Sequence, residues 1–269
     1  MKGFLPVKAA ITVDPTFLAA PLLNVVLGTG LPTEEQLRAV LEGSFGDRVS
    51  NFTRGSQPFT FAAELDGEYL IHMTVIEGQH ENPEEAYSIH PVLTGDPAVL
   101  ESVRSQLIVT LLPQNTLAEE TKQFRDARFS HVVHHAQVTA VLAQLPGTVA
   151  VHNTMGQVTF SQKIFIEGVK ETFLPMCAIS VWLTQGTGGI SGYTVGMAAA
   201  GHPELQVMDS SADPTELYYQ LGDLAHYALA KQPLKDGDTM AFAADAPPIS
   251  IADANWTVDP KVPALTVDL

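Results

Sequence analysis

Between Gln114 and Leu145 the sequence contains neither glycine nor proline. The segment opens with a capping box, because Thr116 is followed three residues later by Glu119, and it stops at the helix-breaking pair Pro146–Gly147. We therefore expect one long helix over this range. It would separate two regions of the chain that are rich in strand signals.

The region before this helix combines strands with a shorter helix. An apolar strand is expected at 22–28, and a helix at 32–45 whose capping box is formed by Thr33 and Gln36. Two alternating segments, 59–65 and 68–78, flank Asp66–Gly67 and predict a hairpin. A short helical piece then leads into a strand at 106–113.

The region after the long helix reads in a similar way. Strands are expected at 148–153, on both sides of the glycine-rich turn 186–192, and at 204–210, whereas 154–172 has no clear pattern. A well-marked helix follows, with Asp213 as its N-cap, Pro214 as its first residue and Glu216 as the box partner. A further strand is expected at 234–242, and 247–252 has the pattern of an edge strand.

This order of elements predicts an α+β protein made of two packed ferredoxin-like halves of βαββαβ type. We expect a lead-in at 1–21, a first half at 22–112, a second half with the long helix at 113–254, and a loosely held tail at 255–269.

The composition limits the partners of such a protein. Acidic residues outnumber basic ones by 30 to 14, and the formal net charge is −16. This charge repels nucleic acid and anionic membranes and favours encounter with a basic protein. The one cysteine, Cys177, lies in an apolar segment, which excludes an internal disulfide and indicates a buried thiol. We expect a cytoplasmic protein without a cofactor.

Three histidines in the long helix raise the question of a metal site. On a helical wheel His131, His134 and His135 fall on the apolar stripe, and a pair at i and i+4 has the spacing to share an ion. The segment lacks the glutamate of a His-Glu-x-x-His motif, so it supplies no general base. We expect histidines that belong to the core stripe, with metal binding as the alternative.

Two glycine-containing segments resemble catalytic or cofactor motifs only in part. Gly28-Thr29-Gly30 follows a strand, but Thr33 stands where a dinucleotide fingerprint needs its third glycine. Ser191 lies in a glycine-rich segment, but Tyr193 replaces the second glycine of a nucleophile elbow. We interpret the first segment as a turn with a helix N-cap and the second as a hairpin turn, and we expect no catalytic residue in either.

Partner-binding candidates lie in two places. Glu81, Glu84 and Glu85 form an acidic loop, and Tyr219 and Tyr227 fall off the apolar stripe of the last helix together with His226. That stripe consists of leucine and alanine side chains that we expect to be buried: Leu217, Leu221, Leu224, Ala225 and Ala228. A solvated loop and aromatic side chains that pack on neighbouring elements are the structural alternatives.

The C-terminal third resembles a bacterial domain-of-unknown-function family, the one numbered 4261. The family pattern is Tyr/Thr-Thr-x-Gly, then Gly-x-x-Glu-Leu/Ile, then Asp-Pro/Ser with a helix containing Ala-x-Tyr, and finally Asp-Gly-x-Thr. The matching residues here are Tyr193, Thr194 and Gly196, then Gly201, Glu204 and Leu205, then Asp213, Pro214, Ala225 and Tyr227, and finally Asp236, Gly237 and Thr239. The resemblance extends over roughly 22–242 and implies no catalytic residue.

Two hypotheses about function follow. The first is a non-enzymatic acidic protein that binds another protein, and an immunity- or antitoxin-like protein that neutralises a basic toxin is its concrete version by analogy. The second is an enzyme or a small-molecule sensor that uses the cleft between the halves, with His131 and His135 on a metal. The surroundings of the histidines and the lining of the cleft distinguish the two.

Overall fold

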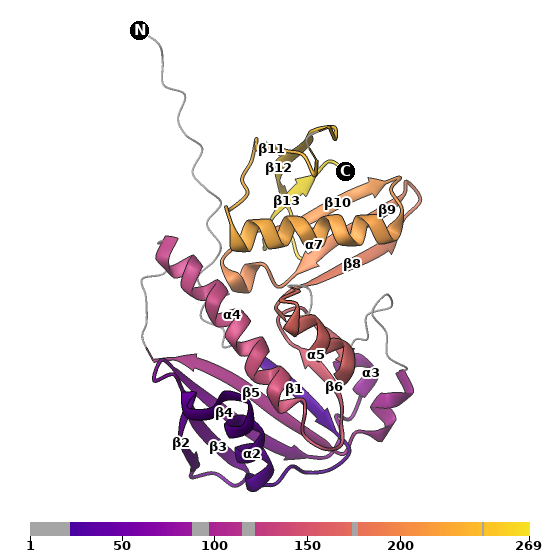
Figure 1. Cartoon of the computed structure of the whole chain (residues 1–269). Helices are drawn as coiled ribbons and strands as arrows, with labels where there is room; N and C mark the ends of the chain where they lie inside the picture. The colour runs from indigo at the N-terminus through magenta and orange to yellow at the C-terminus, as the bar shows by residue number, and fades with distance from the viewer. Residues whose placement is uncertain (1–21, 88–96, 115–121, 174–176, 244) are drawn as a thin grey trace.

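The computed structural model describes residues 22–87, 97–114, 122–173, 177–243 and 245–269. It shows helices combined with two separate β-sheets, so the chain has the expected α+β class. The two sheets lie at opposite ends of the molecule, with helices α4, α5 and α7 between them (Figure 1). No described helix has both the length and the apolar character that crossing a membrane requires.

The first sheet has seven strands in the order β2-β3-β4-β5-β1-β6-β7, and all neighbours are antiparallel. Its strands are β1 (Leu23–Gly28), β2 (Val49–Arg54), β3 (Thr60–Leu65), β4 (Tyr69–Glu77), β5 (Ser105–Pro113), β6 (Thr148–Asn153) and β7 (Val158–Ser161). The hairpin expected around Asp66–Gly67 is confirmed as the β3–β4 connection, where Leu65 pairs with Tyr69. Both turn residues have positive φ, which asparagine, aspartate and glycine tolerate best.

Three helices cover one face of this sheet: α2 (Glu34–Phe45), α4 (Lys122–Leu142) and α5 (Gln162–Lys170). The capping box of α2 is confirmed, because Thr33 and Gln36 exchange backbone-to-side-chain hydrogen bonds of 2.9 and 3.2 Å. Helix α4 confirms the long helix over 122–142, whereas the expected capping residues Thr116 and Glu119 lie outside the described residues. The short helices α3 (Pro83–Ala86) and η2 (Pro97–Ser102) lie on the other face, beside a small apolar cluster that contains Leu100.

The connections within the first sheet place its central strands in a defined order. The chain passes from β1 through α2 and the β2–β3 pair to β4, and β5 then inserts between β4 and β1. From β5 the chain passes through α4 to β6, on the far side of β1. The α4 crossover therefore joins β5 and β6 across the antiparallel strand β1, and the whole connection from β1 to β4, which contains α2 and the β2–β3 pair, passes across β5.

The second sheet has six strands in the order β11-β12-β13-β10-β9-β8. The strands are β8 (Ser180–Gln185), β9 (Ile190–Val195), β10 (Glu204–Ser210), β11 (Thr239–Met240), β12 (Ile249–Asn255) and β13 (Pro263–Val267). Helix α7 (Pro214–Ala230) packs on β8, β9 and β10. Asp213 is its N-cap as expected, and its carboxylate accepts hydrogen bonds from the backbone N–H groups of Thr215 and Glu216.

The structure differs from the expected division of the chain in two respects. Strands β6 and β7, which fall within the expected second half 113–254, belong to the first sheet, so the chain changes sheets after 161 and not at 112. The expected loose tail, 255–269, contains β13, which lies between β12 and β10 and pairs in parallel with β10. The strand expected at the edge, β12, is consequently an inner strand.

The two sheets share one continuous apolar core. Buried side chains of α4, α5 and α7 connect Val26 and Ile71 of the first sheet with Val181 and Leu265 of the second. A polar contact also joins the two parts, because Nε of Arg128 on α4 donates to the carbonyl oxygen of Ala199 at 2.9 Å. Ala199 lies in the short 3-10 helix η3 (Ala198–Ala200) that precedes β10.

Candidate functional site: a groove between helices α5 and α7

The histidines of α4 face the first sheet. Nε2 of His131 lies 2.6 Å from the carbonyl oxygen of Leu111, and Nε2 of His135 lies 3.0 Å from that of Val109. Since a carbonyl oxygen can only accept, both rings donate their Nε2–H to strand β5. The side chains of His131 and His135 are 5% and 2% exposed, so the structure places them in the core stripe of α4.

This environment favours neutral imidazole. Burial lowers the pKa of both His131 and His135 to about 4, and the nearby Arg128 guanidinium acts in the same direction. Arg128 also donates to Nδ1 of His131 at 3.4 Å, so both nitrogens of that ring have hydrogen-bond partners. Among the described residues, no three side chains of histidine, cysteine, aspartate or glutamate are grouped as a metal site requires.

His134 is the third member of the cluster and has a different position. Its Nδ1 lies 2.8 Å from the carbonyl oxygen of Ser130 on the same helix, and its ring contacts Tyr69 at a centroid distance of 5.3 Å. Tyr69 also stacks on His131. His131 and His135 therefore anchor α4 on two carbonyl oxygens of β5, whereas His134 bonds within its own helix and contacts β4 through Tyr69.

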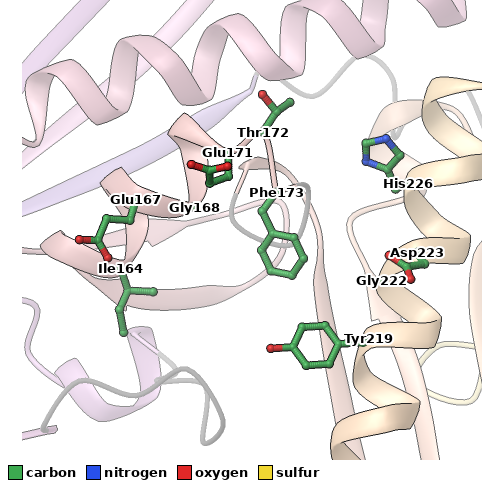
Figure 2. Close-up of a pocket in the computed structure, with 10 residues that line it drawn as sticks. All are labelled: Ile164, Glu167, Gly168, Glu171, Thr172, Phe173, Tyr219, Gly222, Asp223 and His226. Atoms are coloured by element: carbon green, nitrogen blue, oxygen red, sulfur yellow. The ribbon is translucent and has the colours of Figure 1, made fainter.

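A groove of about 530 Å³ lies between α5, which packs on the first sheet, and α7, which packs on the second. Figure 2 shows Phe173 and Tyr219 in the space between the helices, with Asp223 and His226 on the α7 side and Glu171 on the α5 side. Its described lining consists of residues from two segments: Ile164, Glu167, Gly168, Glu171, Thr172 and Phe173, and Tyr219, Gly222, Asp223 and His226.

Helix α5 forms one wall of the groove, and the sequence pattern failed to predict it. The hydroxyl of Ser161 accepts a hydrogen bond from the backbone N–H of Ile164 and caps the helix. Phe165 and Val169, four residues apart, are buried against the core. The opposite side of this short helix therefore faces outward, and Glu167 and Glu171 lie on it. The serine cap followed by an i, i+4 apolar pair is the signal that could have revealed the helix.

Helix α7 forms the other wall, and its apolar stripe is confirmed. All five side chains assigned to it are buried: Leu217, Leu221, Leu224, Ala225 and Ala228. Burial of this stripe leaves the other side of α7 free, and Tyr219 is 53% exposed there. Tyr227, the second tyrosine proposed from the sequence, is 37% exposed, but it lies two turns further along and does not line the groove.

Carboxylates dominate the polar lining of the groove, which also includes the imidazole of His226. Glu167, Glu171 and Asp223 supply three carboxylates, and the described lining includes no lysine or arginine. The two lysines of α5, Lys163 and Lys170, are exposed and do not line it. In a groove that also contains two aromatic rings, this arrangement favours a cationic group with apolar or planar parts.

The acidic loop proposed from the sequence is a different surface. Glu81 is exposed and does not line the groove. Glu84 and Glu85 belong to α3, but their side chains lie outside the part of the structure that is described. The structure thus brings two of the side chains proposed from the sequence, Tyr219 and His226, into the groove together with carboxylates that the sequence did not indicate.

A buried carboxylate on β10 binds β9 and the segment that follows β9. Oε1 of Glu204 accepts hydrogen bonds from the backbone N–H groups of Gly196 and Ala198, both at 3.0 Å, and Oε2 accepts from the Thr194 hydroxyl at 2.7 Å. Burial raises the pKa of Glu204 to about 7, and these hydrogen bonds oppose the rise. Ser191 also lies in the second sheet. It is buried within β9, and its hydroxyl accepts a hydrogen bond from the backbone N–H of Asp209. It lies in a strand and not at the sharp turn of a nucleophile elbow.

Comparison with known families gives one match. Residues 193–265 match the family described as Domain of unknown function (DUF4261), which confirms the resemblance for this part of the chain. No curated protein and no solved structure gave a match. The matched segment contains Thr194, Gly196 and Glu204. These three residues of the family pattern are joined by hydrogen bonds that link β9 and β10, so their role in this structure is in the second sheet. It also contains the α7 wall of the groove, whereas the α5 wall lies outside it.

Proposed function

We propose that this protein is a non-enzymatic binding protein that recognises a basic protein partner through the groove between α5 and α7. The observation that carries the proposal is the lining of the groove, which combines three carboxylates with the rings of Phe173 and Tyr219 and includes no described lysine or arginine. The formal net charge of −16 supports it, because a field of this sign accelerates encounter with a basic surface.

Three further inferences accompany this proposal, on where the protein acts, on the concrete form of its function and on the fold of its first sheet. We infer that the protein acts in the cytoplasm, since its single cysteine is buried and forms no disulfide among the described residues. By analogy, neutralisation of a basic toxin in the manner of an immunity protein is the concrete form of the function. We also infer that β4, β5, β1 and β6 with α2 and α4 form a ferredoxin-like unit with β2 and β3 inserted after α2, because the connections from β1 to β4 and from β5 to β6 each pass one intervening strand.

The second candidate function is a sensor of a small cationic molecule in the same groove. A volume of about 530 Å³ is within the range of small-molecule sites, which favours this candidate. The version with a metal on His131 and His135 is less well supported, because both rings direct Nε2 to carbonyl oxygens of β5.

Two charge-matched variants test the proposal. The groove variant replaces Glu167 and Glu171 by Gln and Asp223 by Asn, and the loop variant replaces Glu81, Glu84 and Glu85 by Gln. Each removes three negative charges, so the net charge of the protein changes equally in both. A partner recovered by pull-down from the source cell is then measured for association and dissociation rates at two salt concentrations.

We expect both variants to slow association, and the groove variant alone to accelerate dissociation, because only it loses direct contacts. Association with the wild type should slow as salt rises, since exposed charges are screened over about 8 Å at physiological ionic strength. If the partner dissociates faster from the loop variant than from the groove variant, the binding surface is the acidic loop and not the groove. Failure to recover any protein partner would favour the small-molecule candidate.

A further inference from the structure

We propose that the groove between α5 and α7 is a receptor for an arginine side chain of the partner, with the guanidinium beside Glu171 and Asp223 and in contact with Phe173 and Tyr219. This inference rests on the proposed function and specifies the chemistry of the group that the partner inserts. Three features of the two walls support it: the position of the carboxylates, the glycines of the two helices, and the aromatic rings.

The carboxylates of α5 lie where a helix disfavours them. Glu167 is in the last turn of α5, and Glu171 is its C-cap. The C-terminus of a helix carries a partial negative charge, so carboxylates at this end are repelled, whereas a bound cation is attracted. Two glutamates at this position are unfavourable for the free helix and favourable once a cation is present. Locally unfavourable choices of this kind are typical of functional sites.

Each wall also contains a glycine within its helix. Gly168 of α5 and Gly222 of α7 both line the groove, and a glycine inside a helix is less favourable than alanine. Neither residue projects a side chain into the groove; Gly168 is half-buried and Gly222 is buried. The two walls therefore have no side chain at these positions, at a cost in helix propensity.

The aromatic rings favour arginine over lysine. Phe173 comes from the segment after α5 and Tyr219 from α7, and Figure 2 shows both rings in the space between the walls. A guanidinium is planar, stacks on aromatic faces and pairs with a carboxylate through two parallel N–H donors. A lysine ammonium is more strongly hydrated and lacks this planar surface. The groove has carboxylates on both walls and aromatic rings between them, so it matches a guanidinium better than an ammonium group.

The test uses N-acetyl-arginine N-methylamide as the probe, because it presents the side chain without charged termini. The citrulline counterpart is a neutral isostere, and the lysine counterpart carries the same charge without the plane. Binding is followed by chemical-shift changes in the isotope-labelled full-length protein. We expect shifts confined to residues 164–173 and 219–226, at least fivefold weaker binding of the lysine probe, and no binding of the citrulline probe.

Variants of the two walls locate the site. The double variant Glu171→Gln/Asp223→Asn should weaken binding of the arginine probe at least tenfold, whereas Glu216→Gln, a carboxylate on α7 outside the groove, should leave it unchanged. Gly168→Ala should weaken binding while the protein remains at least as thermally stable as the wild type. This combination separates a role in binding from a role in folding.

The outcomes for this inference differ from those for the proposed function. Equal binding of the arginine and citrulline probes, shifts outside the two walls, or an unchanged affinity of the double variant would overturn it. If a protein partner is recovered while the arginine probe fails to bind the groove, the proposed function stands and the arginine site is refuted. If the probe binds but no protein partner is found, the arginine site stands and the proposed function fails.

Discussion

Gly192 of β9 lies directly beneath Leu221 of α7. A Cβ atom at position 192 would be 2.6 Å from Cδ1 of Leu221, closer than Cβ atoms approach in proteins, and 3.0 Å from Cδ2 of Leu183, a tight contact. The absence of a side chain at Gly192 therefore allows α7 to lie close to the second sheet. The same contact fixes the height of α7 above the sheet, and hence the position of the groove wall that contains Tyr219.

Replacement of Gly192 by alanine should destabilise the protein by about 1–3 kcal/mol, because the new methyl group overpacks the interface between β9 and α7. Gly43→Ala is the matched control, since a Cβ there meets no atom within 4 Å and the residue lies inside helix α2. The control should raise stability by roughly 0.5–1 kcal/mol through helix propensity. Chemical denaturation measures both. Equal effects of the two substitutions would contradict the proposed contact.

Leu221→Ala should cost about 2–5 kcal/mol, because the side chain is fully buried and its loss leaves a cavity. In this background Gly192→Ala should cost less than it does in the wild type, since the truncated side chain makes room for the added methyl group. A double-mutant cycle by denaturation measures this coupling. Additive effects would mean that the two residues do not contact each other.

Acid should destabilise the protein between about pH 6.5 and pH 4. Folded His131 and His135 have pKa values of about 4, whereas the unfolded chain takes up these protons near pH 6.5, so lowering the pH through this window favours unfolding. Each residue contributes roughly 3 kcal/mol across the window. His135→Gln keeps an N–H donor for the Val109 carbonyl and should make the dependence less steep. Denaturation curves at a series of pH values provide the measurement, and an unchanged slope would refute the assignment.

Glu204 should produce a pH dependence of the opposite sign. Its folded pKa of about 7 exceeds the unfolded value of 4.5, so its contribution is lost as the pH rises through this range. Glu204→Gln should gain stability relative to the wild type as the pH rises, because the amide remains neutral and its oxygen can still accept from Gly196 and Ala198. Glu204→Leu should lose stability at every pH, since it leaves both N–H groups without an acceptor at about 1–3 kcal/mol each. Denaturation at pH 5 and pH 8 compares the three proteins.

Local signals in the sequence were sufficient for many elements of the fold. The Thr33–Gln36 box, the Asp66–Gly67 turn and the Asp213 N-cap each act within a few residues, and the structure confirms all three. The apolar stripe of α7 follows from helical periodicity in the same way. These features depend on neighbours along the chain, so they are readable without knowledge of the tertiary structure.

Features that depend on distant partners could not be predicted in this way. Pairing of β13 with β10 joins residues some 60 positions apart, such as Gln206 and Thr266, and the proline-containing segment gives no local indication of it. The groove has the same character, because its walls come from 164–173 and 219–226. Tyr219 was identified as exposed from its place on the wheel, but its neighbours on α5 depend on how the two halves pack.

The carboxylates of α5 should reduce the stability of the unbound protein. Because Glu167 and Glu171 face the negative end of the helix, Glu167→Gln and Glu171→Gln should each stabilise it by about 0.3–1 kcal/mol at low ionic strength. Lys170→Gln is the control with the opposite sign, since this lysine in the last turn interacts favourably with the same helix end. Added salt should shrink all three effects, because the residues are exposed to solvent. Thermal unfolding at two salt concentrations is the measurement. Loss of stability on removing either glutamate would show that the carboxylates serve the fold and would remove one argument for a bound cation.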